Sequence, residues 1–249
     1  MRAEQHPWGR FPVGSWKTVR VVSETLDDKG NVANVTSTDT RTTLVAVDVK
    51  TFTLKVEVTV EVAGKRFASQ PQLARHGFFG ELVGEPIVVK KTGDGELTID
   101  GNKIPCEIQQ LTLETPERKR TSTLHYSSEV FPFVLRRETT LVEGTEAKTT
   151  SSLVDVVSTG PPEKVLGELK PAAFVKTVRK GPGGSSVTIE VQCHDVPGGV
   201  VSHSAQERNE TGRTVRRSTL DLVDYSIGDG QLNENPLIRR RKFHRNRSR

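Results

Sequence analysis

The six histidines are the side chains of this chain best suited to chemistry: His6, His76, His125, His194, His203 and His244. None has the His-x-x-x-His or His-Glu-x-x-His spacing that brings two ring nitrogens to one metal ion. His194-Asp195 and His203-Ser204 contain the residue types of a hydrolase triad. The Gly-x-Ser-x-Gly turn that exposes a serine nucleophile is missing. We therefore expect no catalytic residues, no metal and no enzymatic activity.

Two further motifs have a structural interpretation. Gly181 to Gly184 is glycine-rich, but the Lys-Ser/Thr pair of a phosphate-binding loop does not follow it. A hairpin turn is favoured there, and no cofactor is expected. Cys106 and Cys193 are too few for a zinc site. Both lie in strand-like runs, which favours buried free thiols over a disulfide.

The formal net charge of +5 belongs mainly to the C-terminal tail. The tail carries a basic run, Arg239, Arg240, Arg241 and Lys242, while the rest of the chain is close to neutral. Such a run could bind an anionic surface, either nucleic acid or lipid head groups. A solvated, disordered segment over residues 228–249 is the favoured interpretation. The near-neutral body gives no reason to expect a nucleic-acid partner.

The elements that must position any site are strands. From Phe52 to Val62 apolar and polar residues alternate strictly, which predicts a long central strand with one buried face. Val187, Ile189, Val191 and Cys193 likewise share one face of a strand. The whole pattern predicts an all-β protein: a strongly curved antiparallel sheet, as a half-barrel or open barrel, with repeated hairpins and few short helices.

We divide the chain by its turn signals and composition shifts. The expected parts are an N-terminal lead (1–15), a main antiparallel region (16–158), a linker with a short helix at 163–169 (159–171), a repeated hairpin region (172–227) and the basic tail (228–249). Pro71 to Glu85 lacks periodicity but is apolar and glycine-punctuated, so it is a candidate lid over the open sheet. Tight packing of this loop on the core is the alternative.

Two internal echoes support the repeated hairpins. Lys17-Thr18-Val19-Arg20 recurs at 176–179, and the segment 125–158 resembles the segment 194–226. Both longer copies contain a proline break, a strand, a glycine turn and a closing strand that ends in Leu-Val-Asp. One supersecondary unit used more than once would produce this pattern.

The first longer copy also resembles a known family. Tyr126, Glu129, Pro132, the run 135–138, Gly144 and the run 153–155 are similar to a hairpin of the lipoprotein-carrier superfamily of periplasmic half-barrels. The chain as a whole also resembles repeat-containing proteins of planctomycete-type bacteria. The resemblance implies a curved sheet whose concave apolar face, covered by loops or short helices, binds lipid-linked ligands in the cell envelope.

These observations lead to one expected function and one alternative. We expect a non-enzymatic envelope protein that binds an apolar or lipid-like ligand, such as a lipid or lipoprotein. The expected ligand-binding residues, on the apolar face and the lid, are Phe52, Leu54, Val56, Phe78, Phe79, Leu82, Leu111 and Leu113. The alternative is a structural or protein–protein interaction module without a ligand cavity.

The expected compartment is the periplasm or cell envelope. No apolar run is long enough for a transmembrane segment. The first seven residues contain no apolar core of a signal peptide, so the cytoplasm stays an alternative.

Overall fold

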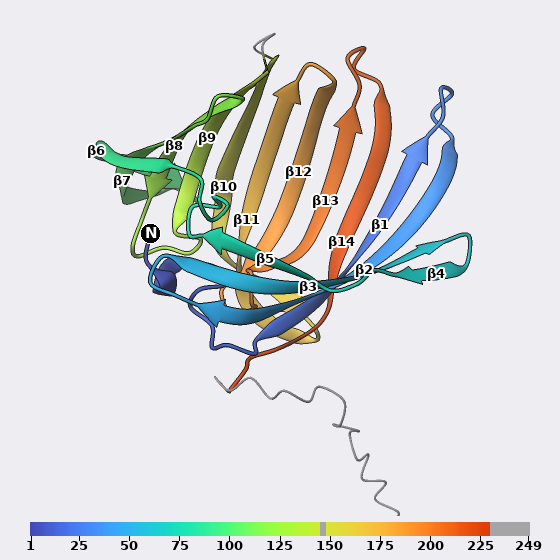
Figure 1. Cartoon of the computed structure of the whole chain (residues 1–249), viewed down its shortest axis with the longest axis horizontal. Coiled ribbons are helices and arrows are strands. Elements are labelled where there is room, and N and C mark those ends of the chain that lie inside the picture. The colour runs from blue at the N-terminus through green and yellow to red at the C-terminus, as the bar shows by residue number, and fades with distance from the viewer. Residues whose placement is uncertain (145–147, 230–249) are drawn as a thin grey trace, which may run out of the picture.

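A computed structural model describes residues 1–144 and 148–229 of the chain. Fourteen strands form one antiparallel sheet in the order β4-β3-β2-β1-β14-β13-β12-β11-β10-β9-β8-β7-β6, and β5 pairs with β3 beside β4 (Figure 1). The order never closes into a ring. The predicted all-β, open and curved antiparallel sheet is therefore confirmed.

The strands are long, as the extended alternating pattern requires. Their bounds are β1 (Trp16–Leu26), β2 (Val32–Val47), β3 (Thr51–Val62), β4 (Lys65–Ala68), β5 (Gln72–Gly77), β6 (Ile87–Ile99), β7 (Asn102–Glu114), β8 (Arg118–Tyr126), β9 (Val134–Glu143), β10 (Lys148–Val165), β11 (Glu168–Gly181), β12 (Gly184–Cys193), β13 (Val200–Arg208) and β14 (Thr214–Ser226). Among the described residues the one helical element is a 3-10 turn, Ala3–Gln5. The basic run at 239–242 lies outside the described residues.

The sheet is strongly curved, and we call the part formed by β2 and β3 and the part formed by β9 to β11 its two walls. The two walls face one shared interior. Arg10 of the N-terminal lead shows this, because its guanidinium lies 4.9 Å from the ring centre of Phe11 and 5.5 Å from that of Phe131. Phe11 packs with Leu44 and Phe52 of β2 and β3, whereas Phe131 packs against the cluster on β9 to β11. Six strands separate β3 from β10 in the sheet order.

The interior is filled at one end of this curl. One apolar cluster lies on β2, β3 and the segment after β5, and it consists of Phe11, Leu44, Phe52, Leu54 and Phe78. A second cluster lies where the β6–β7 hairpin meets the other wall, and it consists of Ile99, Ile104, Cys106, Leu135, Val156, Ala173 and Val175. Both clusters combine residues far apart in sequence, so they hold the curl together.

Residues 78–86, which we call the strap, connect the two ends of the sheet order. They follow β5, which pairs with β3, and precede β6 at the opposite edge. Phe78 packs into the β3 cluster, whereas Arg137 of β9 donates a hydrogen bond to the Phe79 carbonyl oxygen at 3.5 Å. Glu85 forms an ion pair with Arg118 of β8. The strap therefore draws the two walls toward each other.

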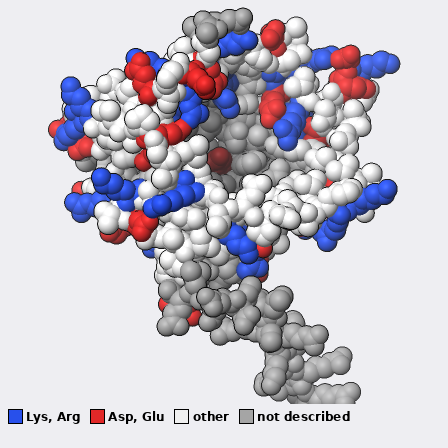
Figure 2. Space-filling view, viewed as in Figure 1, with Lys and Arg blue, Asp and Glu red and all other residues white. Residues whose placement is uncertain are grey.

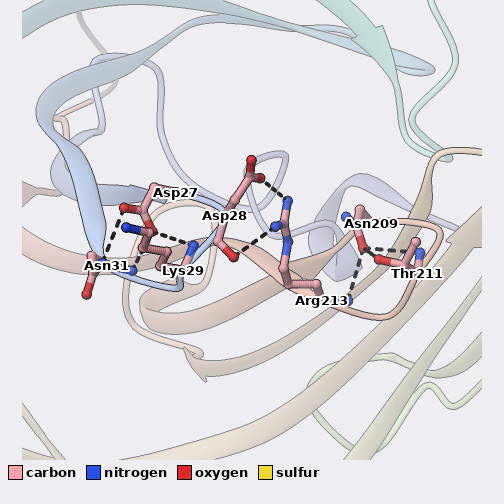
Figure 3. A network of polar contacts seen from close by, with 7 residues as sticks. All are labelled: Asp27, Asp28, Lys29, Asn31, Asn209, Thr211 and Arg213. Carbon is pink, nitrogen blue, oxygen red and sulfur yellow. Dashed lines mark hydrogen bonds and ion pairs between the residues drawn. The ribbon is translucent and has the colours of Figure 1, made fainter.

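A polar network joins two hairpin turns at one rim of the sheet (Figure 3). Asp27 in the β1–β2 turn accepts hydrogen bonds from the backbone of Lys29 and Asn31, both at 2.8 Å. Asn209 plays the same role in the β13–β14 turn. Arg213 of the second turn lies 2.7 Å from the Asp28 carboxylate in the first. Each turn is therefore stabilised by its own Asx residue, and the ion pair joins the two.

Three expectations about the elements were wrong. The predicted helix at 163–169 is instead the tip of the β10–β11 hairpin, because Leu166 and Gly167 both have positive φ (48° and 96°), which a two-residue hairpin turn requires. The strand at 52–62 is not central but lies next to an edge. Part of the predicted irregular segment 71–85 is strand β5 (Gln72–Gly77), which pairs Ala74 with Leu54.

Candidate ligand-binding site

The concave face is built from alternate residues of neighbouring strands. The pairing register places one row of side chains across its middle: Val175, Glu190, His203, Leu220, Val21, Thr38 and Val60. Because side chains alternate along a strand, the next residues of each strand point to the convex face. Figure 2 shows that the middle of the concave face is hollowed.

Exposure distinguishes the two faces. On β12, Thr188 and Glu190 of the concave face are partly buried, whereas Val187 and Ile189 of the convex face are 40% and 41% exposed. On β14, Ser218 and Leu220 are likewise more sheltered than Arg217 and Thr219. The hollow is therefore a sheltered surface of mixed apolar and polar side chains.

Titratable groups lie at the base of this hollow. Lys17 of β1 is buried, and its Nζ donates a hydrogen bond to the Val200 carbonyl oxygen at 2.9 Å. Burial lowers the pKa of Lys17 to about 8, and the charge of Glu190 opposes this shift. His203 is the cross-strand neighbour of Glu190, and burial lowers its pKa as well. A charged group thus lies among apolar neighbours on this face.

The eight predicted ligand-binding residues divide by their position. Phe52, Leu54 and Phe78 are buried in the cluster against the N-terminal lead, and Val56 packs at its margin. Leu111 and Leu113 are buried on β7, at the opposite end of the sheet order. Phe79 is partly buried and Leu82 is 52% exposed, both in the strap. The strap brings the two groups toward one interior, but most of these side chains are already packed.

The N-terminal lead is what covers the predicted apolar face. Trp8 lies against Gly198, where an added Cβ would be 2.6 Å from the indole Nε1. The His6 ring lies 4.4 Å from Phe52 and 5.3 Å from Phe78. The lead therefore fills the concave side next to Phe52, Phe78 and Gly198. The row through Glu190 and Leu220 lines the part of the concave face that stays open.

The convex face also carries a groove. It is a groove of about 480 Å³ along β12, β13, β14 and β1, lined by Val22, Glu24, Val187, Ile189, Ser204, Ala205, Gln206, Arg217, Ser218 and Thr219. Arg217 and Glu24 form an ion pair of 2.7 Å on its floor. None of the predicted ligand-binding residues contributes to this groove.

The residues with triad chemistry are not brought together. His203 points to the concave face and Ser204 to the convex face, since they are neighbours in one strand. His194 lies 3.7 Å from Asp195 and packs edge-on against Phe131 and Phe133. Cys106 and Cys193 are buried free thiols, as expected. In the described part of the chain no cluster of His, Cys, Asp or Glu has the geometry to hold a metal ion.

Sequence reasoning missed Lys17, Glu190 and His203 as site residues. Glu190 and His203 occupy polar positions of alternating strands, where a solvated face is the usual interpretation. A signal did exist in β12, where Thr188, Glu190 and Gln192 alternate with valine and isoleucine. Only the curl of the sheet decides which of these two sets is enclosed.

Comparison with known proteins gives limited similarity. No family model and no curated protein matches the chain. Among solved structures, a predicted exported protein with a YmcC-like fold from Bacteroides fragilis covers 87% of this chain and 98% of its own, with 11% identity and a TM-score of 0.34. A predicted lipoprotein from Parabacteroides distasonis covers 87% of this chain and 97% of its own, also with 11% identity and a TM-score of 0.34. Within the described residues no helix is both long and apolar enough to span a membrane.

Proposed function

We propose that this protein is a non-enzymatic binding protein of the cell envelope that holds an apolar, lipid-like ligand in the hollow of its concave face. The observation that carries the proposal is the row of partly buried side chains that includes Val21, Leu220 and Val60. Apolar side chains sheltered within a concave surface favour a ligand that removes them from water. The envelope location follows from the resemblance of the 125–158 hairpin to the lipoprotein-carrier superfamily.

The strap provides a route by which the ligand reaches the concave face. Gly80 and Gly84 have φ values of +82° and +94°, and an added Cβ would meet nothing at either position. The strap is held to the β8–β9 wall by the bond from Arg137 to the Phe79 carbonyl and by the pair of Arg118 with Glu85. Phe78 stays packed in the β3 cluster, so the part of the strap that can open without unfolding the sheet is the part after Phe78. A ligand would then enter beside the strap.

A competing function rests on the groove of the convex face. Val187 and Ile189 line it and are exposed, which is typical of a surface held for a partner. This observation favours the protein–protein interaction module. The two functions place the binding surface on opposite faces of the same strands, so paired variants distinguish them.

The test uses a neutral fluorescent apolar probe, N-phenyl-1-naphthylamine. Leu220→Trp on β14 fills the concave hollow, whereas Ile189→Trp on β12, two strands away, fills the convex groove. We expect probe affinity to fall in Leu220→Trp and to stay near wild type in Ile189→Trp. Absence of probe binding by the wild-type protein would refute the proposal. Loss of binding only in Ile189→Trp would favour the convex groove.

A further inference from the structure

Two arginines on the concave face lack carboxylate partners among the described residues. Arg120 of β8 is the cross-strand neighbour of Leu113, and Arg137 of β9 is the neighbour of Leu124. The register places both side chains on one face. Arg137 donates only to the Phe79 carbonyl of the strap, at the long distance of 3.5 Å.

Several other arginines of the sheet do form ion pairs with carboxylates. Arg118 pairs with Glu85, and Arg216 lies 3.7 Å from Glu207. Arg136, next to Arg137 but on the convex face, lies 2.9 Å from Glu138 and 3.6 Å from Asp155. Arg120 and Arg137 therefore differ from these neighbours in forming no ion pair with a carboxylate among the described residues.

The surroundings of Arg137 make its positive charge costly. Burial lowers the pKa of Arg137, and the nearby charge of Arg120 lowers it further, while Glu81 of the strap opposes the shift. Two neighbouring guanidinium groups carry more positive charge than the one nearby carboxylate of Glu81 neutralises, and a bound anion would compensate the remainder. The structure thus leaves a site of positive charge beneath the strap.

The groups around the two arginines define the shape of the missing partner. Ser122 and Thr139 lie between them in the register, and their hydroxyl oxygens are 2.9 Å apart. Leu111, Leu113 and Leu124 are buried on the same face of β7 and β8. The two hydroxyls bond to each other and Ser122 is buried, so the two guanidinium groups are the donors available to a ligand. They suit a phosphate, because arginine donates parallel hydrogen bonds to its oxygens. The adjacent leucines are already buried, so they shelter the arginines from water.

We propose that Arg120 and Arg137 form a phosphate head-group subsite, so that the ligand is an anionic amphiphile whose chain lies in the concave hollow. This inference rests on the proposed function and names the chemistry of its ligand. The long bond from Arg137 to Phe79 is readily given up, so the head group replaces the strap carbonyl as the partner of Arg137. The phosphate could come from a lipid or from free phosphate, and the experiment separates these sources.

The experiment measures displacement of N-phenyl-1-naphthylamine by dodecyl phosphate, dodecanol and inorganic phosphate. Arg120→Gln and Arg137→Gln remove the proposed charges, and Arg136→Gln is the matched control on the other face. We expect each of the first two to weaken dodecyl phosphate binding about tenfold, the effect of losing one charge-assisted contact. Dodecanol should bind equally to all variants, and Arg137→Lys should restore part of the affinity for dodecyl phosphate.

Three outcomes would overturn the inference. The first is equal binding of dodecyl phosphate to Arg120→Gln, Arg137→Gln and wild type. The second is dodecanol binding as tightly as dodecyl phosphate to wild type. The third is inorganic phosphate competing as strongly as dodecyl phosphate, which would make the site one for the free ion. Probe binding without any effect of the arginine variants would leave the apolar hollow intact and refute the head-group subsite alone.

Discussion

Lys17 and Val200 lie 183 residues apart in the chain, yet the Lys17 ammonium donates a 2.9 Å hydrogen bond to the Val200 carbonyl oxygen. The bond runs from β1 to the start of β13, past β14, which lies between them in the sheet. It is possible only because the concave face turns both groups inward. The indole of Trp8 lies 5.9 Å from the same ammonium, so the base of the hollow is closed around a buried charge.

The buried Lys17 should make stability depend on alkaline pH. Its pKa is about 8 when folded, against 10.5 for the ordinary side chain. Between these values the unfolded chain binds more protons, so the free energy of unfolding rises with pH. The shift corresponds to about 3 kcal/mol. Urea unfolding between pH 7 and pH 10.5 should show wild type gaining this much relative to Lys17→Met, and parallel curves would contradict the assignment.

His6 should give the same direction of pH dependence as Lys17, but in the acidic range. Burial, and then the charge of His76, lower the pKa of His6 to about 4 from 6.5. As pH falls through this window the unfolded chain takes up a proton that the folded chain refuses, so stability is lost. His6→Asn keeps an acceptor for the backbone N–H groups of Trp8 and Gly9 but does not titrate. Between pH 6.5 and pH 4 the unfolding free energy of His6→Asn should therefore change less than that of the wild-type protein, with a difference of up to about 3 kcal/mol.

The two adjacent phenylalanines of the strap should differ in their contribution to stability. Phe78 is 4% exposed inside the β3 cluster, whereas Phe79 is only partly buried. Phe78→Ala should therefore cost about 3 to 5 kcal/mol, and Phe79→Ala a small fraction of that. Chemical unfolding of both variants measures the difference. Equal losses would show that the strap is packed along its whole length, with no part free to open.

The contact of the lead with the β12–β13 loop can be tested at a single glycine. Gly198 and Gly212 both have positive φ, at +74° and +81°. An added Cβ at Gly198 would lie 2.6 Å from Trp8, but at Gly212 it would meet nothing. Both alanine variants carry the same backbone strain, so an additional loss of about 1 to 3 kcal/mol in Gly198→Ala measures the displaced lead. Equal melting temperatures would mean that the lead is not packed there.

Several features of the fold could be predicted from the sequence because they depend on local pattern. The alternation from Phe52 to Val62 predicted β3 and its buried face, and β3 forms with Phe52 and Leu54 buried. The irregular segment before Ile87 was a candidate lid, and its second half is the strap. The helix at 163–169 was wrong because Leu166-Gly167 makes a turn whose geometry outweighs the weak helical pattern around it.

The site itself depends on non-local geometry. Val187 and Ile189 alternate like core residues, yet they point to the convex face. The repeated Lys-Thr-Val-Arg segments also differ, since Lys17 is buried in the concave face and Lys176 is exposed. Which face of a strand is enclosed follows from the direction of the curl, and the curl is set by the lead, the strap and the β6–β7 hairpin together. The alternation of one strand contains no information about it.

Photo-crosslinking with a diazirine-labelled dodecyl amphiphile tests the central claim most directly, because it marks the face on which the ligand lies. Neighbouring residues of one strand point to opposite faces, so peptide sequencing by mass spectrometry distinguishes them. The account predicts adducts at Val21, Leu220 and Val60 on the concave face. Adducts confined to Val22, Val187 and Ile189 on the convex face would contradict it.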